Sequence, residues 1–522
     1  MPAPHVERRV VIAIVITLIG IGVVFRFMHL GTIPGINGDE GWWGVQSTRW
    51  MHGLSYEAKT TSGNPIDMAF LVPLGLLHGL AGPSFFVLRL FPAIANVVAL
   101  GVGFSLARKL YGSPTAWIYT CALAVAPTAI AHSRFCQDPS QSILWTSITM
   151  FLALLGLKDR RHWWAYLIAA LLAFGMGFWT HPTNVFVAPF LVLPIVPIVR
   201  RWIPESRRGR IVFAASALAA LLVIVVIVLF VIWPALKSRA GSSVLLDKPW
   251  LSAAAERVAS PAQWFEHVRN YGRLFTGVTV YRYMSMPDLT VWGYGASALL
   301  VMAATGAGVW RLIRLERMSL DVGLVFGWGA AWLLFFLFAG PESIRPHVER
   351  WGLVLIPPAL LLLARGMVGW LAYRRLATLA VATVLALALL GTFYASYFHE
   401  FQTSGGRSHR TFKTASTEPK QQALERILDE RKGSEPVLII TQEWWQYWPI
   451  RYLAQPDAAI TVEMKVPDSV PASGRMYFVD FVGTEELARA RAWIAERGLR
   501  GRESAIQSAG GRDLVTITEV VR

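Results

Sequence analysis

The stretch that decides the fold class is residues 211–236, which read IVFAASALAALLVIVVIVLFVIWPAL. It contains no charged residue and is rich in Val, Ile and Leu. A helix needs about 20 consecutive apolar residues to cross the hydrocarbon core of a bilayer. This stretch is long enough, and it predicts a helix that spans a membrane.

Ten further apolar runs predict that the chain crosses the membrane repeatedly. The eleven expected spans are 10–28, 85–107, 114–131, 139–157, 163–179, 183–199, 211–234, 291–310, 320–339, 351–369 and 376–397. The composition agrees, since 54% of the 522 residues are hydrophobic and 16% are charged, whereas an ordinary soluble protein is about a quarter charged. These patterns exclude a single water-soluble globule and predict a polytopic α-helical membrane protein.

The positive charges predict the topology. Lys and Arg number 49 against 33 Asp and Glu, a net charge of +16. Nearly every short basic cluster falls on one side if residues 68–80 form a short interfacial helix instead of a further span. We therefore expect a multi-pass protein of the inner or plasma membrane with a cytoplasmic N-terminus. Connections 29–84 and 235–290 would lie outside, and the excess charge would reflect topology, with no nucleic-acid partner.

The last part of the chain has the composition of a soluble domain. Strand patterns occur at 436–440, 459–464, 476–481 and 514–520, and helical patterns at 423–431 and 485–497. This order predicts an extracytoplasmic α/β domain over 398–522, after a transmembrane domain over 1–397. The chain has no Gly-rich phosphate loop, and its two cysteines exclude a disulfide scaffold.

Ionisable residues gather at the expected outer ends of the spans. Such groups are costly at membrane depth and are therefore candidates for function. The candidates are Asp39, Glu40, Arg134, Asp138, His181 and Arg350.

Transfer of a sugar from a lipid-linked phosphate would use this set of groups. An acceptor hydroxyl must lose its proton as it attacks the anomeric carbon, so one carboxylate would serve as general base. The departing phosphate would be stabilised by cationic or N–H donors. Other membrane chemistries could use the same groups.

Four stretches carry a resemblance to a known family. They are Asp39-Glu40, residues 88–93 (LRLFPA), Ser133-Arg134-Phe135 with Asp138-Pro139, and Glu349-Arg350-Trp351 followed by Pro357-Pro358. Together with the hydropathy pattern over 10–397, the sequence resembles the GT-C membrane glycosyltransferases of the protein O-mannosyltransferase type. That type includes the bacterial relatives that place aminoarabinose on lipid A.

The resemblance implies a GT-C fold and an inverting transfer from a polyprenyl-phosphate sugar to an acceptor hydroxyl at the outer face. The acceptor would be a glycan, a lipid or a protein. Asp39 matches the general base, with Glu40 beside it, Asp138 matches the second acidic position, and Arg350 matches an arginine near the donor phosphate. His181 and Arg134 are further candidates for phosphate binding. This chain has Asn64-Pro65, His181-Pro182 and Trp351 where many relatives differ, which leaves the phosphate-binding set and any divalent metal open.

Each candidate also has a purely structural alternative. Asp39 would cap a helix, and Asp138 would begin one before Pro139. Glu40 would only interact with a helix dipole, whereas its functional role would be to support the site or to bind a metal. His181 would be a solvated connector, Arg350 an interfacial anchor, and Arg134 an ion-pair partner of Asp138.

The second long connection is rich in aromatic residues. Trp264, His267 and Tyr271 are candidates for contact with the acceptor or the lipid chain, and an ordinary interfacial helix would explain them equally well. The spacing of the outer histidines matches no zinc motif.

Two rival functions remain. A ligase or polymerase would move a whole glycan from a polyprenyl diphosphate, and would be expected to carry more basic outer residues than this chain has. A lipid or solute transporter would usually show internal repeats, and none is evident.

Overall fold

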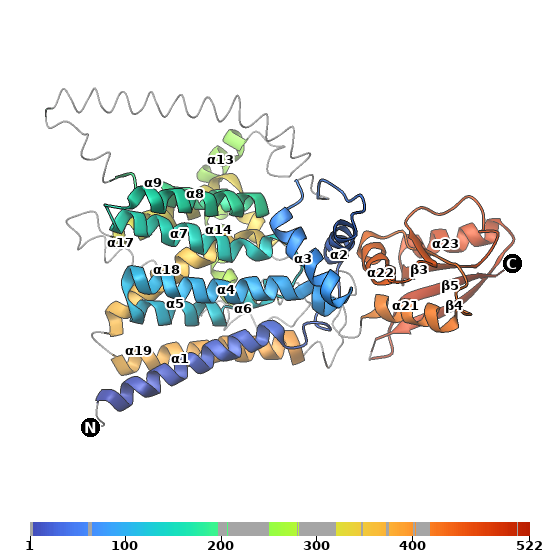
Figure 1. The fold of residues 1–522 in the computed structure, drawn as a ribbon, viewed down its shortest axis with the longest axis horizontal. Coiled ribbons are helices and arrows are strands. Elements are labelled where there is room, and N and C mark those ends of the chain that lie inside the picture. Colours follow the sequence, from blue (N-terminus) through green and yellow to red (C-terminus); the bar gives the residue numbers. More distant parts are fainter. Residues whose placement is uncertain are drawn as a thin grey trace.

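A bundle of long helices and a sheet domain lie end to end in the computed structural model, with α2 and α3 between them (Figure 1). The N-terminus lies at the far end of the bundle from the sheet domain. The structure describes residues 4–60, 65–196, 206, 250–278, 280, 320–345, 348–371, 375–399, 402, 418–508 and 510–521.

The bundle is built from apolar helices and the short segments that continue them. Its elements are α1 (Pro4–Phe27), α4 (Phe85–Tyr111), α5 (Ser113–Val125), α6 (Pro127–His132), η1 (Asp138–Gln141), α7 (Ser142–Lys158), α8 (Trp163–Thr180), η2 (Pro182–Val187), α9 (Pro189–Val192), α17 (Leu320–Phe338), η4 (Pro341–Ile344), η5 (Glu349–Leu355), α18 (Ile356–Leu371), α19 (Arg375–Phe393) and the π-helical η6 (Tyr394–His399). Within the described residues, seven helices are long and apolar enough to cross a membrane.

Those seven helices correspond to seven of the eleven predicted spans. Of the other four, 211–234 and 291–310 lie outside the described residues. The predicted run 114–131 is instead divided between α5 and α6, because Pro127 disfavours helical geometry at the residue before it, and Ala126 is extended with ψ 113°. The run 183–199 begins with two short pieces, η2 and α9.

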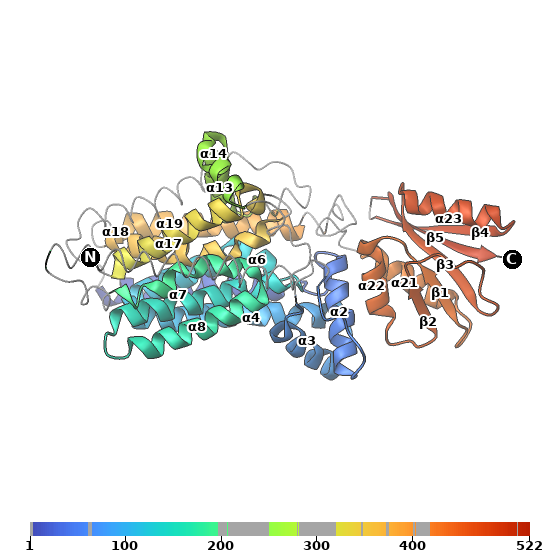
Figure 2. The same ribbon diagram turned by 90° about the horizontal axis from the view of Figure 1, so that it is seen from above.

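The first connection folds into α2 (Gly38–Met51) and α3 (Met68–Ala81). Helix α2 lies across the end of the bundle (Figure 2). The side chains of Asn37 and Glu40 form a reciprocal capping box at its start. Helix α3 has 14 residues, about 21 Å of helix, which is too short to span and suits the predicted interfacial position.

The second connection contains α13 (Trp250–Ala259) and α14 (Pro261–Leu274). The rings of Trp264 and His267 on α14 pack against Trp332 and Phe336 on α17.

The C-terminal domain is a five-stranded sheet in the order β2-β1-β3-β5-β4. Strands β1 (Val437–Ile440), β2 (Ile460–Glu463) and β3 (Arg475–Phe481) are parallel, and β5 (Asp513–Val521) is antiparallel to β3 and to β4 (Arg500–Gln507). Helices α21 (Pro419–Glu430), α22 (Trp444–Ala454) and α23 (Glu485–Glu496) complete it. The sequence patterns found six of these eight elements and missed α22 and the charged, largely exposed strand β4.

One apolar core runs from the first connection into the C-terminal domain. It includes Trp42 of α2, Phe70 of α3, Tyr452 of α22 and Val479 of β3. The end of the bundle that carries α2 is therefore covered by the sheet domain.

Candidate active site

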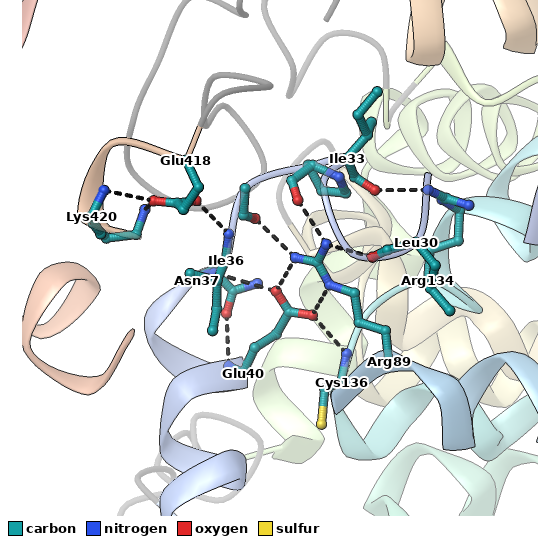
Figure 3. A network of polar contacts seen from close by, with 12 residues as sticks. Leu30, Ile33, Ile36, Asn37, Glu40, Arg89, Arg134, Cys136, Glu418 and Lys420 are labelled. Carbon is teal, nitrogen blue, oxygen red and sulfur yellow. Dashed lines mark hydrogen bonds and ion pairs between the residues drawn. The ribbon is translucent and has the colours of Figure 1, made fainter. Parts of the chain in front are cut away.

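Arg89 on α4 holds the chain that leads into α2 (Figure 3). Its guanidinium donates to the carbonyls of Leu30, Pro34 and Gly35 at 3.2, 2.7 and 3.0 Å, and to both oxygens of Glu40 at 2.8 Å each. Both side chains of this ion pair are 0% exposed. A bidentate arginine–carboxylate pair fixes direction as well as distance, so the start of α2 is firmly positioned.

Glu40 uses both of its oxygens inside this network. Oε1 also accepts the N–H of Cys136 at 2.9 Å, and Oε2 accepts the N–H of Asn37 at 3.3 Å. Each oxygen therefore accepts two hydrogen bonds, one of them from Arg89. Glu40 therefore braces the loop beside Asp39.

Arg134 is also occupied by the protein. It is completely buried and donates to the carbonyls of Phe25, His29 and Ile33 at 2.7, 3.3 and 2.7 Å. Its guanidinium lies over the ring of Phe398, 4.9 Å from the centroid. Buried carbonyls need donors, and Arg134 supplies them to the segment between α1 and α2. It is therefore not available for the predicted phosphate contact or for the alternative ion pair with Asp138.

Asp39 lies in the first turn of α2, two residues after the cap. The cap is Asn37, so the alternative that Asp39 caps the helix is wrong. The half-buried carboxylate accepts the indole N–H of Trp444 at 3.3 Å. Burial raises the pKa of the Asp39 carboxyl above its usual value, against the opposing effects of Arg350 and the Trp444 N–H. A carboxylate with a raised pKa is a better proton acceptor.

Arg350 is the common electrostatic partner of the predicted site residues. It interacts with Asp39, with Asp138 at the first position of η1, and with His181. Its side chain is half-buried, and its guanidinium donates no hydrogen bond to a described residue. The structure thus brings three side chains that are widely separated in the sequence within electrostatic range of one cation, whose N–H groups can donate to a ligand.

The neighbour of Arg350 anchors this segment. Glu349 is buried, and its Oε1 lies 3.4 Å from Nε2 of His132 on α6. Because this contact anchors Glu349 on α6, the adjacent Arg350 is held at the start of η5.

His181 caps η2 and is only 8% exposed, so it is not a solvated connector. Its Nδ1 lies 2.7 Å from Thr183 Oγ1 and accepts the Thr183 N–H at 3.4 Å. A backbone N–H can only donate, so Nδ1 is unprotonated and Nε2 carries the hydrogen. Burial, reinforced by Arg350, lowers the pKa of His181 to about 3. His181 is therefore neutral and offers an N–H donor, not a positive charge.

Asp67 is a site residue that the sequence reading missed. It caps α3 through the N–H of Ala69 at 2.9 Å, is 1% exposed, and interacts electrostatically with Asp138. Burial raises the pKa of its carboxyl to about 6. An Asp directly before an apolar helical run is a recognisable cap signal, but nothing in the sequence links that cap to Asp138.

The three residues predicted to contact acceptor or lipid lie on α14 and pack against α17. His267 is 0% exposed, with its ring centroid 4.7 Å from that of Trp332, and Tyr271 accepts the Trp328 indole N–H at 2.8 Å. The ring centroid of Trp264 lies 4.1 Å from that of Phe336. These side chains are committed to helix packing, which corrects the expectation that His267 and Tyr271 are open to a ligand.

Metal ligands do not cluster in the described part of the chain. No three His, Cys, Asp or Glu side chains there lie close enough together to hold a metal ion.

Comparison with known proteins shows which fold this chain has. The model of the family described as dolichyl-phosphate-mannose-protein mannosyltransferase matches residues 65–233. Among solved structures, ArnT from Cupriavidus metallidurans bound to undecaprenyl phosphate aligns over 96% of this chain and 97% of its own, with 15% identity and a TM-score of 0.52. The chain has the GT-C glycosyltransferase fold.

A second GT-C structure shows the same fold. The archaeal oligosaccharyltransferase AglB from Archaeoglobus fulgidus, in complex with an inhibitory peptide and a dolichol-phosphate, aligns over 97% of this chain and 74% of its own, with 14% identity and a TM-score of 0.52. A search of curated proteins finds no match. The family match and the fold support a GT-C glycosyltransferase of the ArnT and protein mannosyltransferase type, which confirms the resemblance drawn from the four sequence stretches.

The family match covers only part of the candidate site. Asp67, Asp138 and His181 lie inside the matched region, whereas Asp39 and Arg350 lie on either side of it. The structure is therefore what brings the two halves of the site together.

Proposed function

We propose that this protein transfers a sugar from a polyprenyl phosphate to a hydroxyl group of an acceptor, at the outer face of the membrane. The observation that carries the proposal is that the carboxylate of Asp39 lies within electrostatic range of the guanidinium of Arg350. A base and a cation in one site match the two charges that such a transfer generates. The catalytic domain would be 1–397, with the domain over 398–522 outside the membrane.

Asp39 would act as the general base. As the acceptor oxygen attacks the anomeric carbon, its proton moves to Asp39, so that a neutral glycoside forms. One carboxylate oxygen accepts the Trp444 N–H at 3.3 Å, which leaves the second oxygen for the acceptor hydroxyl. Glu40 would position this residue through Arg89 and would not itself exchange a proton.

Arg350 and His181 would receive the leaving group. The bond from the anomeric carbon to the phosphate oxygen breaks with its electron pair on the phosphate. The Arg350 guanidinium offers several N–H donors to that charge, and the neutral His181 offers one from Nε2. Attack from the face opposite the phosphate inverts the anomeric centre. Asp138 would orient Arg350 before the donor arrives.

Relatives with this fold support the chemical class of the donor. ArnT was crystallised with undecaprenyl phosphate, and AglB with a dolichol-phosphate and an inhibitory peptide. Both lipids are polyprenyl phosphates, the product expected when the sugar leaves.

A panel of donors tests the proposal. The purified protein in lipid nanodiscs is given polyprenyl-phosphate sugars, polyprenyl-diphosphate glycans, and a membrane extract as acceptor, with and without a chelator to decide metal dependence. Acceptor-dependent release of polyprenyl phosphate from a monophosphate donor supports the proposal. Release only from diphosphate donors would favour a glycan ligase, and no turnover by folded protein would favour a transporter.

A further inference from the structure

The C-terminal domain touches the proposed catalytic residue directly. Trp444, the first residue of α22, donates its indole N–H to Oδ1 of Asp39 across 405 positions of sequence. Burial alone would disfavour the ionised carboxylate, and the Trp444 N–H opposes that effect. The indole N–H can only donate, so this contact specifically favours the form of Asp39 that can accept a proton.

The contact depends on an unusually close approach of two helices. A Cβ atom added to Gly38, Gly41 or Gly44 would lie 2.5 Å from an atom of α22, namely Trp444 Cδ1, Pro449 N and Tyr452 Cδ2 respectively. Residues three apart lie along one face of a helix. The glycines at 38, 41 and 44 therefore form a smooth face of α2 on which α22 rests.

Further contacts tie the C-terminal domain to the segments around α2. Before α2, Glu418 at the start of α21 accepts the N–H of Ile36 at 2.7 Å (Figure 3). Beyond α2, the hydroxyl of Tyr452 on α22 lies 2.8 Å from Nε2 of His78 on α3 and donates to the carbonyl of Ser84 at 3.1 Å. The position of the domain against α2 therefore does not depend on the Trp444 hydrogen bond alone.

We propose that the C-terminal domain completes the active site and that Trp444 is a positioning residue for Asp39. By binding Oδ1, Trp444 fixes the orientation of the carboxylate and directs Oδ2 toward the acceptor. This inference rests on the proposed function, because it assumes that Asp39 is the base. The domain over 398–522 is then part of the catalytic unit and not an appended module.

The test is the Trp444→Phe variant of the full chain, which keeps a large ring and removes the N–H. The pH profile of kcat/KM is measured for acceptor-dependent release of polyprenyl phosphate. Removing a donor from a carboxylate raises the pKa of that carboxyl. We expect the acidic limb to move up by about one pH unit and kcat at neutral pH to fall about tenfold. The KM for the donor should not change, because the Trp444 N–H binds the proposed base.

Trp448→Phe is the matched control. Trp448 lies on the same helix and is buried, but its indole N–H donates no hydrogen bond to any of the described residues. We expect its pH profile to match the wild type. Gly38→Ala is a second variant, which displaces the Trp444 indole without altering α22 and should reproduce the shifted limb.

Two outcomes separate this inference from the proposed function. If Asp39→Asn abolishes transfer but folded Trp444→Phe keeps the wild-type pH profile, Trp444 is only a packing residue and the inference is wrong. If Asp39→Asn transfers sugar at the wild-type rate, the proposed base is wrong, and the role of Trp444 falls with it. If Trp444→Phe does not fold, the acidic limb of the pH profile of Gly38→Ala decides whether Trp444 positions Asp39.

Discussion

Arg89 and Glu40 form a fully buried, bidentate ion pair, with both nitrogen–oxygen distances at 2.8 Å. Arg89 also donates to three carbonyls of the loop that precedes α2. The pair therefore connects span α4 to the segment that carries Asp39, and it sets where the proposed base lies.

Removing one partner of this pair should unfold the loop as well as lower activity. Glu40→Ala leaves the Arg89 guanidinium buried without its counter-charge, and breaking a buried pair in this way costs about 3–5 kcal/mol. Thermal unfolding in detergent should show a lower Tm than that of the wild type. Glu496→Ala, which removes an exposed carboxylate from α23, is the control and should leave the Tm unchanged. Equal Tm values for both variants would rule out the bracing role of Glu40.

Arg350→Ala should reduce transfer without affecting stability. Its guanidinium accounts for no hydrogen bond among the described residues, so little packing is lost, whereas the leaving phosphate loses its main cation. Removal of one such donor typically lowers kcat by about 10²–10³. Arg345, five residues earlier at the end of η4, is exposed, and Arg345→Ala should keep wild-type kcat. An equal loss in both variants would show that the effect belongs to the loop and not to Arg350.

His181→Phe should lower kcat/KM by about tenfold, the effect of losing one hydrogen bond to a charged group. Because the pKa of His181 is about 3, the histidine stays neutral between pH 5 and 8, and the loss should be the same throughout that range. His162→Phe, at the exposed other end of α8, is the control. A loss that grows below pH 6.5 would mean that His181 acts as a cation.

The buried carboxyl of Asp480 should make the stability of the C-terminal domain depend on pH. Its carboxyl is 1% exposed, and burial raises its pKa from 3.8 to about 7. A raised folded-state pKa means that the folded protein is favoured while the group is protonated, and that stability falls as pH rises from about 4 through 7. Asp480→Asn should lack this decrease, gaining up to about 4 kcal/mol over the wild type at pH 8. Chemical unfolding at pH 5 and pH 8 measures it, with the exposed Asp468→Asn as control. Parallel pH trends in wild type and Asp480→Asn would contradict the prediction.

Local patterns in the sequence were enough to predict much of the fold. Hydropathy located seven long helices, and short apolar runs located four of the five strands. The broken run at Ala126 was missed because a hydropathy count does not register that Pro127 changes the backbone before it. Strand β4 was missed because its solvent-exposed face is charged.

The candidate site was only partly predictable for a different reason. Ionisable residues at the ends of apolar spans are easy to recognise in a sequence, and this signal identified Asp39, Asp138, His181 and Arg350. Their mutual electrostatic interactions agree with that expectation. Arg134 was misread, since its carbonyl partners come from distant backbone that no side-chain pattern indicates. Trp444 was not a candidate at all, because its contact with Asp39 exists only once α22 packs on α2.

The most direct test of the account is the rate of polyprenyl phosphate release under single-turnover conditions, with wild type, Asp39→Asn and Asp468→Asn compared in the same nanodiscs. The account predicts that Asp468→Asn equals the wild type and that Asp39→Asn, folded to the same Tm, releases product at least about 10²-fold more slowly. Transfer by Asp39→Asn at the wild-type rate would contradict the assignment of Asp39 as the base.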